Sequence, residues 1–185
     1  MQGIVAKYHI GNPSLINKNP IALFCSREID LAVYYDALDF INEIMGLPIA
    51  VAGGWQSTLE KQALKSRTTK MPSGIVYFLA KGINCFTVPK YLKYDFDKNN
   101  LLVLSNWKDA KRIDKKKVEK RDLIIVQTVQ RFLFININEG GNLNRLLNNC
   151  LQQNKQVYIL DHFTNAKWFN NNIQPISVNN LGSLI

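Results

Sequence analysis

The 185-residue sequence lacks the marks of several large protein classes. No apolar run approaches the ~18–20 residues that span a bilayer. The N-terminus has no basic stretch followed by an apolar core, so we expect no membrane segment and no signal peptide. Hydrophobic residues make up 46% and charged residues 20%, which excludes a disordered chain, a collagen-like repeat and a small disulfide scaffold. These absences favour a cytoplasmic globular protein of about one domain.

Cysteine and histidine are scarce. Cys25, Cys85 and Cys150 lie far apart in apolar runs, and no pair has the CxxC spacing of a zinc or redox site. His9 and His162 lie near opposite ends of the sequence and have no metal-ligand spacing. We therefore expect no metal and no cofactor, and we expect all three cysteines to be reduced core residues.

The signature motifs of many nucleotide-binding and hydrolytic enzymes are also missing. The sequence holds no G-x-G-x-x-G fingerprint, no G-x-x-x-x-G-K-[ST] phosphate loop and no G-x-S-x-G nucleophile elbow. Paired acidic residues suited to hydrolysis are not evident, because Asp36 and Asp39 lie on a helix that looks solvated. No motif therefore assigns a catalytic residue.

What the sequence does have is a basic charge balance. Lys and Arg number 23 against 14 Asp and Glu, giving a net charge of +9. Eight basic and three acidic residues lie in the segment 108–121 alone. Such a balance favours anionic partners, above all nucleic acid or nucleotides. The alternatives are an AT-rich genome, which favours Lys and Asn codons, and an ordinary solvated helix face.

Short apolar runs alternate with helical patterns along most of the chain. Continuous apolar runs are typical of strands buried on both faces of a parallel sheet. Six runs predict strands, at residues 21–25, 49–52, 74–80, 101–105, 132–135 and 156–160. Helices are expected at residues 30–45, 58–67, 118–130 and 143–153. This order predicts an α/β protein with a doubly wound, mostly parallel sheet of about six strands and helices on both faces, a Rossmann-like fold.

Three segments follow from this pattern. Residues 1–20 form an N-terminal lead-in with a short strand expected at 4–8. Residues 21–160 form the Rossmann-like domain, and residues 161–185, which are rich in Asn, form a C-terminal tail packed on the surface or partly disordered.

The residues just after each strand are the candidates for function, because ligands of such sheets bind outside the carboxyl ends of the strands. Gly-Gly pairs after two of the strands, each followed by a helix start, could accommodate an anion. The spacing of Ser57 and Glu60 fits a capping box at one of these helix starts. The candidate ligand or phosphate-binding residues are Ser26, Arg27, Gly53, Gly54, Trp55, Ser57, Glu60, Lys81, Gly82, Gly140, Gly141 and Asn142.

Each of these candidates has a plainer interpretation. A Gly pair after a strand is often only a turn. Glu60 could be a general base, but its capping role already explains it. Trp55 and Trp107 could stack on a base or simply pack against a helix.

The order of these segments resembles the DNA-processing protein A family (DprA, also called Smf), over about residues 20–160. Residues 21–27 are similar to that family's first strand, which ends in a Gly-Ser-Arg type sequence, and Ala52-Gly53-Gly54 occupies the place of its Ser-Gly-rich loop. Residues 120–125 resemble its Arg-Asn-Arg-Ile-Ile helix, and residues 140–143 its Ser-Gly-Ser-Leu loop. Gln56 and Thr58 replace the His and Pro of a related stand-alone subgroup, and Leu123 replaces the second Arg of Arg-Asn-Arg.

This resemblance implies a non-catalytic protein that binds single-stranded nucleic acid or a nucleotide and acts in DNA processing or recombination. Lys115, Lys116, Lys117, Lys120 and Arg121 are then the candidate nucleic-acid-binding residues. The same superfamily contains the Lonely Guy phosphoribohydrolases, so a small-nucleotide sensor or nucleoside-monophosphate hydrolase is the alternative. A domain that has kept the fold and lost its ligand is a third hypothesis, and a homodimer is compatible with all three.

Overall fold

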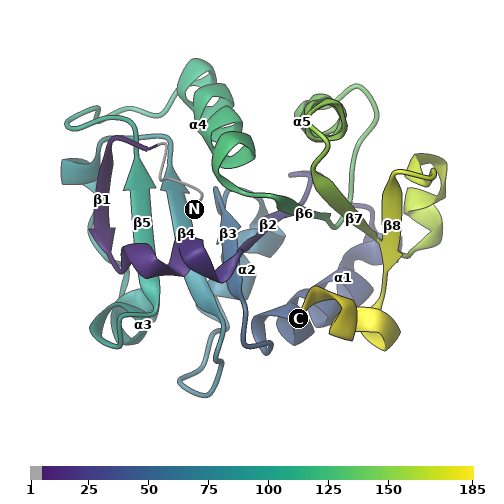
Figure 1. Ribbon diagram of the computed structural model, residues 1–185, viewed down its shortest axis with the longest axis horizontal. Coiled ribbons are helices and arrows are strands. Elements are labelled where there is room, and N and C mark those ends of the chain that lie inside the picture. Colours follow the sequence, from purple (N-terminus) through teal and green to yellow (C-terminus); the bar gives the residue numbers. More distant parts are fainter. Residues whose placement is uncertain (1–5) are drawn as a thin grey trace.

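The computed structural model describes residues 6–185, which form one sheet with helices on both faces (Figure 1). The strands lie in the order β1-β5-β4-β3-β2-β6-β7-β8. All neighbouring pairs are parallel except β1 and β5, which are antiparallel. The strands are β1 (Tyr8–Gly11), β2 (Ile21–Phe24), β3 (Ala50–Gly53), β4 (Gly74–Leu79), β5 (Leu101–Ser105), β6 (Arg131–Phe134), β7 (Gln156–Leu160) and β8 (Ile173–Ile176).

Helices cover both faces of this sheet, with α4 and α5 above it and α1 and α3 below it in Figure 1. The α-helices are α1 (Leu31–Met45), α2 (Thr58–Lys65), α3 (Lys93–Asp97), α4 (Lys115–Thr128) and α5 (Asn142–Gln152). Short 3-10 helices are η1 (Pro13–Lys18), η2 (Ile83–Cys85), η3 (Lys90–Leu92), η4 (Phe163–Trp168) and η5 (Val178–Leu184).

Two hydrophobic cores, one on each face, hold these layers together. In β2, Leu23 points into the core under α1 and α2, whereas its neighbours Ala22 and Phe24 point into the core under α4 and α5. β6 alternates in the same way, with Leu133 on one face and Phe132 on the other. Burial on both faces explains why these strands are continuous apolar runs in the sequence.

The strand order places the sheet's reversal point beside β2. From β2 the chain moves outward through β3, β4 and β5, and it then returns to form β6 on the other side of β2. In open α/β sheets the ligand crevice lies outside the carboxyl ends of the strands at this point. The ends of β2 and β6 are therefore where a site is expected.

The predicted fold class is confirmed, but the sheet has eight strands rather than about six. The two additional strands are β1 in the lead-in and β8 in the C-terminal tail. Both are four-residue edge strands with exposed positions, so neither forms the continuous apolar run that identifies a central strand. Residues 4 and 5 of the strand expected at 4–8 lie outside the described residues, and the observed strand begins at Tyr8.

The predicted helices are found with small shifts of their ends. α4 starts at Lys115 rather than 118, because the Asp114 side chain accepts a hydrogen bond from the Lys117 N–H and caps the helix there. Cys25 and Cys150 are buried, which raises the pKa of each thiol to about 12, whereas Cys85 is only half-buried and is not a core residue. No helix between residues 6 and 185 combines the length and apolarity needed to cross a membrane.

Candidate functional site

A cavity of about 210 Å³ opens at the carboxyl ends of β2 and β3, next to the first residues of α2 and α5. Its lining joins loop residues from these strands with side chains from α4. The polar and glycine residues that line it include Ser26, Arg27, Gly54, Gln56, Ser57, Glu60, Arg121, Asp122, Asn138, Gly141 and Asn142. The cavity therefore lies beside the reversal point of the sheet.

Glu60 holds two walls of this cavity together. The Ser57 Oγ accepts a hydrogen bond from the Glu60 N–H at 3.2 Å, and the Glu60 carboxylate accepts one from the Ser57 N–H at 3.4 Å, which is the expected capping box. The same carboxylate accepts from the backbone N–H of Gln56 at 2.7 Å and of Cys25 at 2.9 Å. Burial raises the pKa of the Glu60 carboxyl, while these N–H donors and Arg121 oppose the rise. These contacts explain Glu60 as the residue that ties β2 to α2.

Arg121 is a buried cation in this cavity, 4% exposed. Its Nε and Nη2 donate to Oδ1 of the neighbouring Asp122, at 2.9 and 2.7 Å. Its Nη1 is buried and has no hydrogen-bond partner among the described residues. A buried guanidinium nitrogen without an acceptor costs free energy, and an acceptor supplied by a ligand would remove that cost.

Gly54 makes room for this guanidinium. A Cβ atom at Gly54 would lie 2.4 Å from Cζ and 2.5 Å from Nη1 of Arg121, far inside van der Waals contact. The Gly-Gly loop after β3 and the basic helix α4 are thus two halves of one structure. Their association explains a glycine that the sequence identified only as a turn or an anion loop.

Asp122 balances part of the Arg121 charge. Burial raises the pKa of the Asp122 carboxyl, whereas the charges of Arg121 and Arg27 act to lower it. A carboxyl with a raised pKa accepts a proton more readily than an exposed one. The negative charge that Asp122 adds to the cavity is therefore lost at a higher pH than that of an exposed aspartate.

The N-terminus of α5 also lines the cavity. Gly141 is the N-cap residue of α5 and offers no side chain to the first helical N–H groups, so they lack the usual side-chain acceptor. The preceding loop is fixed to β2, because the Ser26 Oγ accepts from the Asn138 N–H at 3.1 Å. The positive end of the helix dipole thus lies beside Arg121, at one wall of the same cavity.

Most of the candidate residues meet here, but some do not. The candidates from the sequence that line the cavity are Ser26, Arg27, Gly54, Ser57, Glu60, Gly141, Asn142 and Arg121. Gly53, Trp55, Lys81, Gly82 and Gly140 do not line it. Gly82 instead packs against the chain around Ala110, whose backbone nitrogen would lie 2.5 Å from a Cβ at Gly82.

The expectation that Trp55 binds a ligand is wrong. Its side chain is fully buried, and its Nε1 donates to the backbone oxygen of Val76 at 3.4 Å. Its backbone has a φ of 54°, which turns the ring from the loop into the core beneath β3. A ring with no exposed surface cannot stack on a ligand, so Trp55 is a packing residue.

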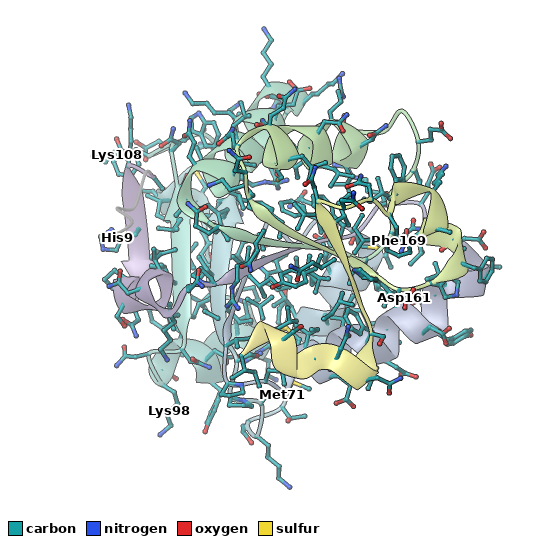
Figure 2. The ribbon with its side chains drawn as sticks, turned by 45° about the vertical axis from the view of Figure 1, so that its right-hand side comes forward. His9, Met71, Lys98, Lys108, Asp161 and Phe169 are labelled. Carbon is teal, nitrogen blue, oxygen red and sulfur yellow. The ribbon has the colours of Figure 1, made fainter. Side chains whose placement is uncertain are left out.

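The predicted basic segment enters α4, which lies directly over this site. Lys115, Lys116 and Lys120 are exposed, while Lys117 pairs with Asp114. Lys115 also lines a larger cavity between α4 and α5. In Figure 2, Lys108 at the beginning of the segment lies at the opposite end of the molecule from Lys98. The basic segment thus starts at the end of the molecule where the parallel strands finish.

Sequence reasoning missed several lining residues, among them Glu28, Gln56, Val118, Asp122 and Asn138. Val118 and Asp122 lie one helical turn apart on α4, close to Arg121. Once Arg121 is taken as a site residue, helical spacing predicts that both lie near the site. Asn138 gave no signal, because its position depends on how the loop before α5 folds against Ser26.

No protein-family model and no curated protein sequence matches the chain. Solved structures do match. DNA processing protein A (DprA) from Streptococcus pneumoniae superposes with a TM-score of 0.73 and 13% identity over 95% of this chain. This chain spans 64% of the length of that protein.

Two further solved structures also match the fold of this chain. DNA processing protein A from Helicobacter pylori, a protein described as binding single-stranded DNA, has a TM-score of 0.66 and 13% identity, covering 96% of this chain and 78% of its own. The protein TM1055 has a TM-score of 0.55 and 11% identity, covering 90% of this chain and 97% of its own. At such identities the likeness concerns the fold alone, and the chain has the Rossmann-like fold of DNA-processing protein A.

Proposed function

We propose that this protein binds single-stranded nucleic acid through its phosphate groups, at the cavity at the carboxyl ends of β2 and β3, and that it serves in DNA processing. The observation that carries the proposal is Arg121, a 4% exposed guanidinium whose Nη1 is buried without a partner in this cavity. A phosphate oxygen is an acceptor of the right charge for that nitrogen.

The surroundings of Arg121 support the same chemistry. The first backbone N–H groups of α5 have no side-chain cap, and Arg27 lines the same wall of the site. A helix N-terminus and two guanidinium groups favour a bound anion, while the carboxyl groups of Glu28, Glu60 and Asp122 in the same cavity act against it. A phosphodiester linkage presents such an anion at every nucleotide.

A polymer is supported more than a small molecule by what lies beside the cavity. Lys115, Lys116 and Lys120 are exposed along the first turns of α4, where they could follow a strand of phosphates. The likeness to a Helicobacter pylori protein described as binding single-stranded DNA adds to this support, at the level of the fold.

A mononucleotide is the second candidate, because the cavity of about 210 Å³ adjoins a larger one of about 720 Å³ with which it shares residues. Together these volumes could hold a phosphate and a nucleoside. Hydrolysis by Glu60 has less support, since its carboxylate oxygens already accept three backbone hydrogen bonds.

The test is the binding of a labelled oligo-dT strand over a range of salt concentrations, measured by fluorescence anisotropy. We expect affinity to fall steeply with salt, with a slope of about −0.7 for each phosphate contacted. The variant Lys115→Gln/Lys116→Gln/Lys120→Gln should reduce that slope by about 2 if all three contact phosphates. As a separate variant, Arg27→Gln should weaken oligo-dT binding relative to the wild type.

A matched control removes the same charge elsewhere. Lys18, Lys70 and Lys98 are exposed. They precede β2, β4 and β5, so they lie at the amino ends of the parallel strands, away from the cavity. Their triple change to Gln should leave the slope unchanged. Equal effects of the two triple variants would reduce the binding to non-specific charge attraction. No oligo-dT binding together with thermal stabilisation by one nucleotide would favour the second candidate.

A further inference from the structure

A groove of about 720 Å³ lies between α4 and α5. Its apolar wall includes Val118, Leu123 and Leu146, together with Ile113 just before α4. Leu123 is 47% exposed and Ile113 50% exposed, although α4 begins as a strongly charged helix. Cavities of about 300–1,000 Å³ are typical of sites for small ligand groups. This α4–α5 groove thus combines uncovered apolar surface with the size of a ligand site.

The groove adjoins the cavity that contains Arg121. Arg27, Val118, Asp122 and Asn142 line both. A ligand whose anionic group binds Arg121 can therefore extend past these shared residues onto the apolar wall of the groove. A ligand of this shape has an anion at one end and a flat or apolar group within a few bonds of it.

The groove also offers polar groups for the edge of such a ligand. Asn142 and Asn149 line it. The Asn149 Oδ1 accepts from the Gln153 Nε2 at 2.6 Å, which leaves an amide nitrogen that can donate to a carbonyl oxygen. A nucleobase has apolar faces and a hydrogen-bonding edge, and it is linked to a phosphate through one sugar. A nucleotide therefore has the anion, the apolar face and the hydrogen-bonding edge that this site would accept.

We propose that the α4–α5 groove holds one unstacked nucleobase of the strand whose phosphate lies beside Arg121, an inference that rests on the proposed function. Val118, Leu123 and Leu146 cover a face of the base, and Asn149 donates to its edge. A helix from a protein partner would also fit an apolar groove between helices. It would bring no anion to Arg121, so the residues shared by the two cavities favour the nucleotide.

The test measures the contribution of the bases to affinity separately from that of the phosphates. Oligo-dT is compared with an abasic strand of equal length, in which every phosphodiester is kept and every base is removed, by anisotropy at one low salt concentration. The wild-type protein should bind oligo-dT about 5-fold or more tightly than the abasic strand, the effect of burying roughly 40 Å² of apolar base surface at ~25 cal/mol/Å². The variant Leu123→Ala should lose most of this preference and keep its affinity for the abasic strand.

Leu31→Ala is the matched control, since Leu31 is an 82% exposed leucine on α1 that lines neither cavity. It should keep the full preference for oligo-dT. Thermal melting of both variants checks that each is folded. Equal wild-type binding of the two strands would overturn the base site and leave the phosphate site standing. Equal loss in the two variants would also overturn it. No binding of either strand would overturn the proposed function, and the base site with it.

Discussion

Among single residues, Asp122 controls how far the Arg121 guanidinium is available to an anion. Its Oδ1 accepts from both Nε and Nη2 of Arg121. Burial raises the pKa of the Asp122 carboxyl above the ordinary value of 3.8, with Glu119 adding to the rise and Arg121 and Arg27 opposing it. As pH falls toward that raised pKa, the carboxyl takes up a proton and its competition with a bound phosphate ends. Anion binding and proton uptake should therefore be linked.

We predict that oligo-dT affinity rises as pH falls through the raised pKa of Asp122, because the phosphodiester charge is constant there while the negative charge of Asp122 declines. Asp122→Asn should raise affinity at pH 7 by about tenfold or less (~1.4 kcal/mol, the order of one charge–charge interaction near a protein surface), and it should reduce this pH dependence, of which the buried Glu60 carboxyl would keep a part. Anisotropy titrations across the pH range measure both. Asp39→Asn, an exposed change on α1, is the control and should alter neither. Weaker binding by Asp122→Asn would mean that the carboxylate is needed to position Arg121.

Between elements, a buried ion pair fixes the segment between α2 and β4 against α3. Arg67, just after α2, donates from Nη2 to Oδ1 of Asp95 in α3 at 2.7 Å, and from Nη1 to the Ser73 Oγ at 2.6 Å. The side chains of Arg67 and Asp95 are 1% and 8% exposed. Because both charges are buried, removing one leaves the other without compensation.

Arg67→Ala is expected to lower the free energy of unfolding by about 3–5 kcal/mol, measured by urea denaturation. Lys93→Ala is the control, because its pair with Asp97 also involves α3 but its two side chains are 61% and 53% exposed. That change should cost about 1 kcal/mol or less. Similar losses in the two variants would show that burial does not decide the strength of these pairs.

Some features of the fold and of the candidate site could be predicted from the sequence, and others could not. The central strands could be predicted because burial on both faces leaves an uninterrupted apolar run, as in Leu101–Ser105. The capping box of Ser57 and Glu60 could be predicted because both partners lie within one helical turn. The contact of Gly54 with Arg121 could not, because it joins a loop and a helix that lie far apart in the chain. Much of the candidate site depends on contacts of that second kind.

Across the whole molecule, the two terminal segments belong to the sheet and its cores. Arg131, at the start of β6, donates to the backbone oxygens of Asn19 and of Leu184, the latter at 2.7 Å, so one side chain binds the lead-in and the C-terminal segment. Its burial lowers the pKa of the guanidinium. The sequence missed this arrangement because two of the four residues of β8 are exposed and one of these is a proline, which conceals a strand at the sheet's edge.

Leu184→Ala tests whether the segment 161–185 is a structural part of the domain. Leu184 is fully buried in the core that contains α1 and α2, so its truncation should lower the free energy of unfolding by about 2–5 kcal/mol. Val178→Ala, at a 54% exposed position of the same 3-10 helix, should change it by about 0.5 kcal/mol or less. Urea denaturation of both variants beside the wild type measures the difference. A small effect at both positions would mean that the segment contributes little to the stability of the sheet, and that the domain ends near β7 as the sequence pattern first indicated.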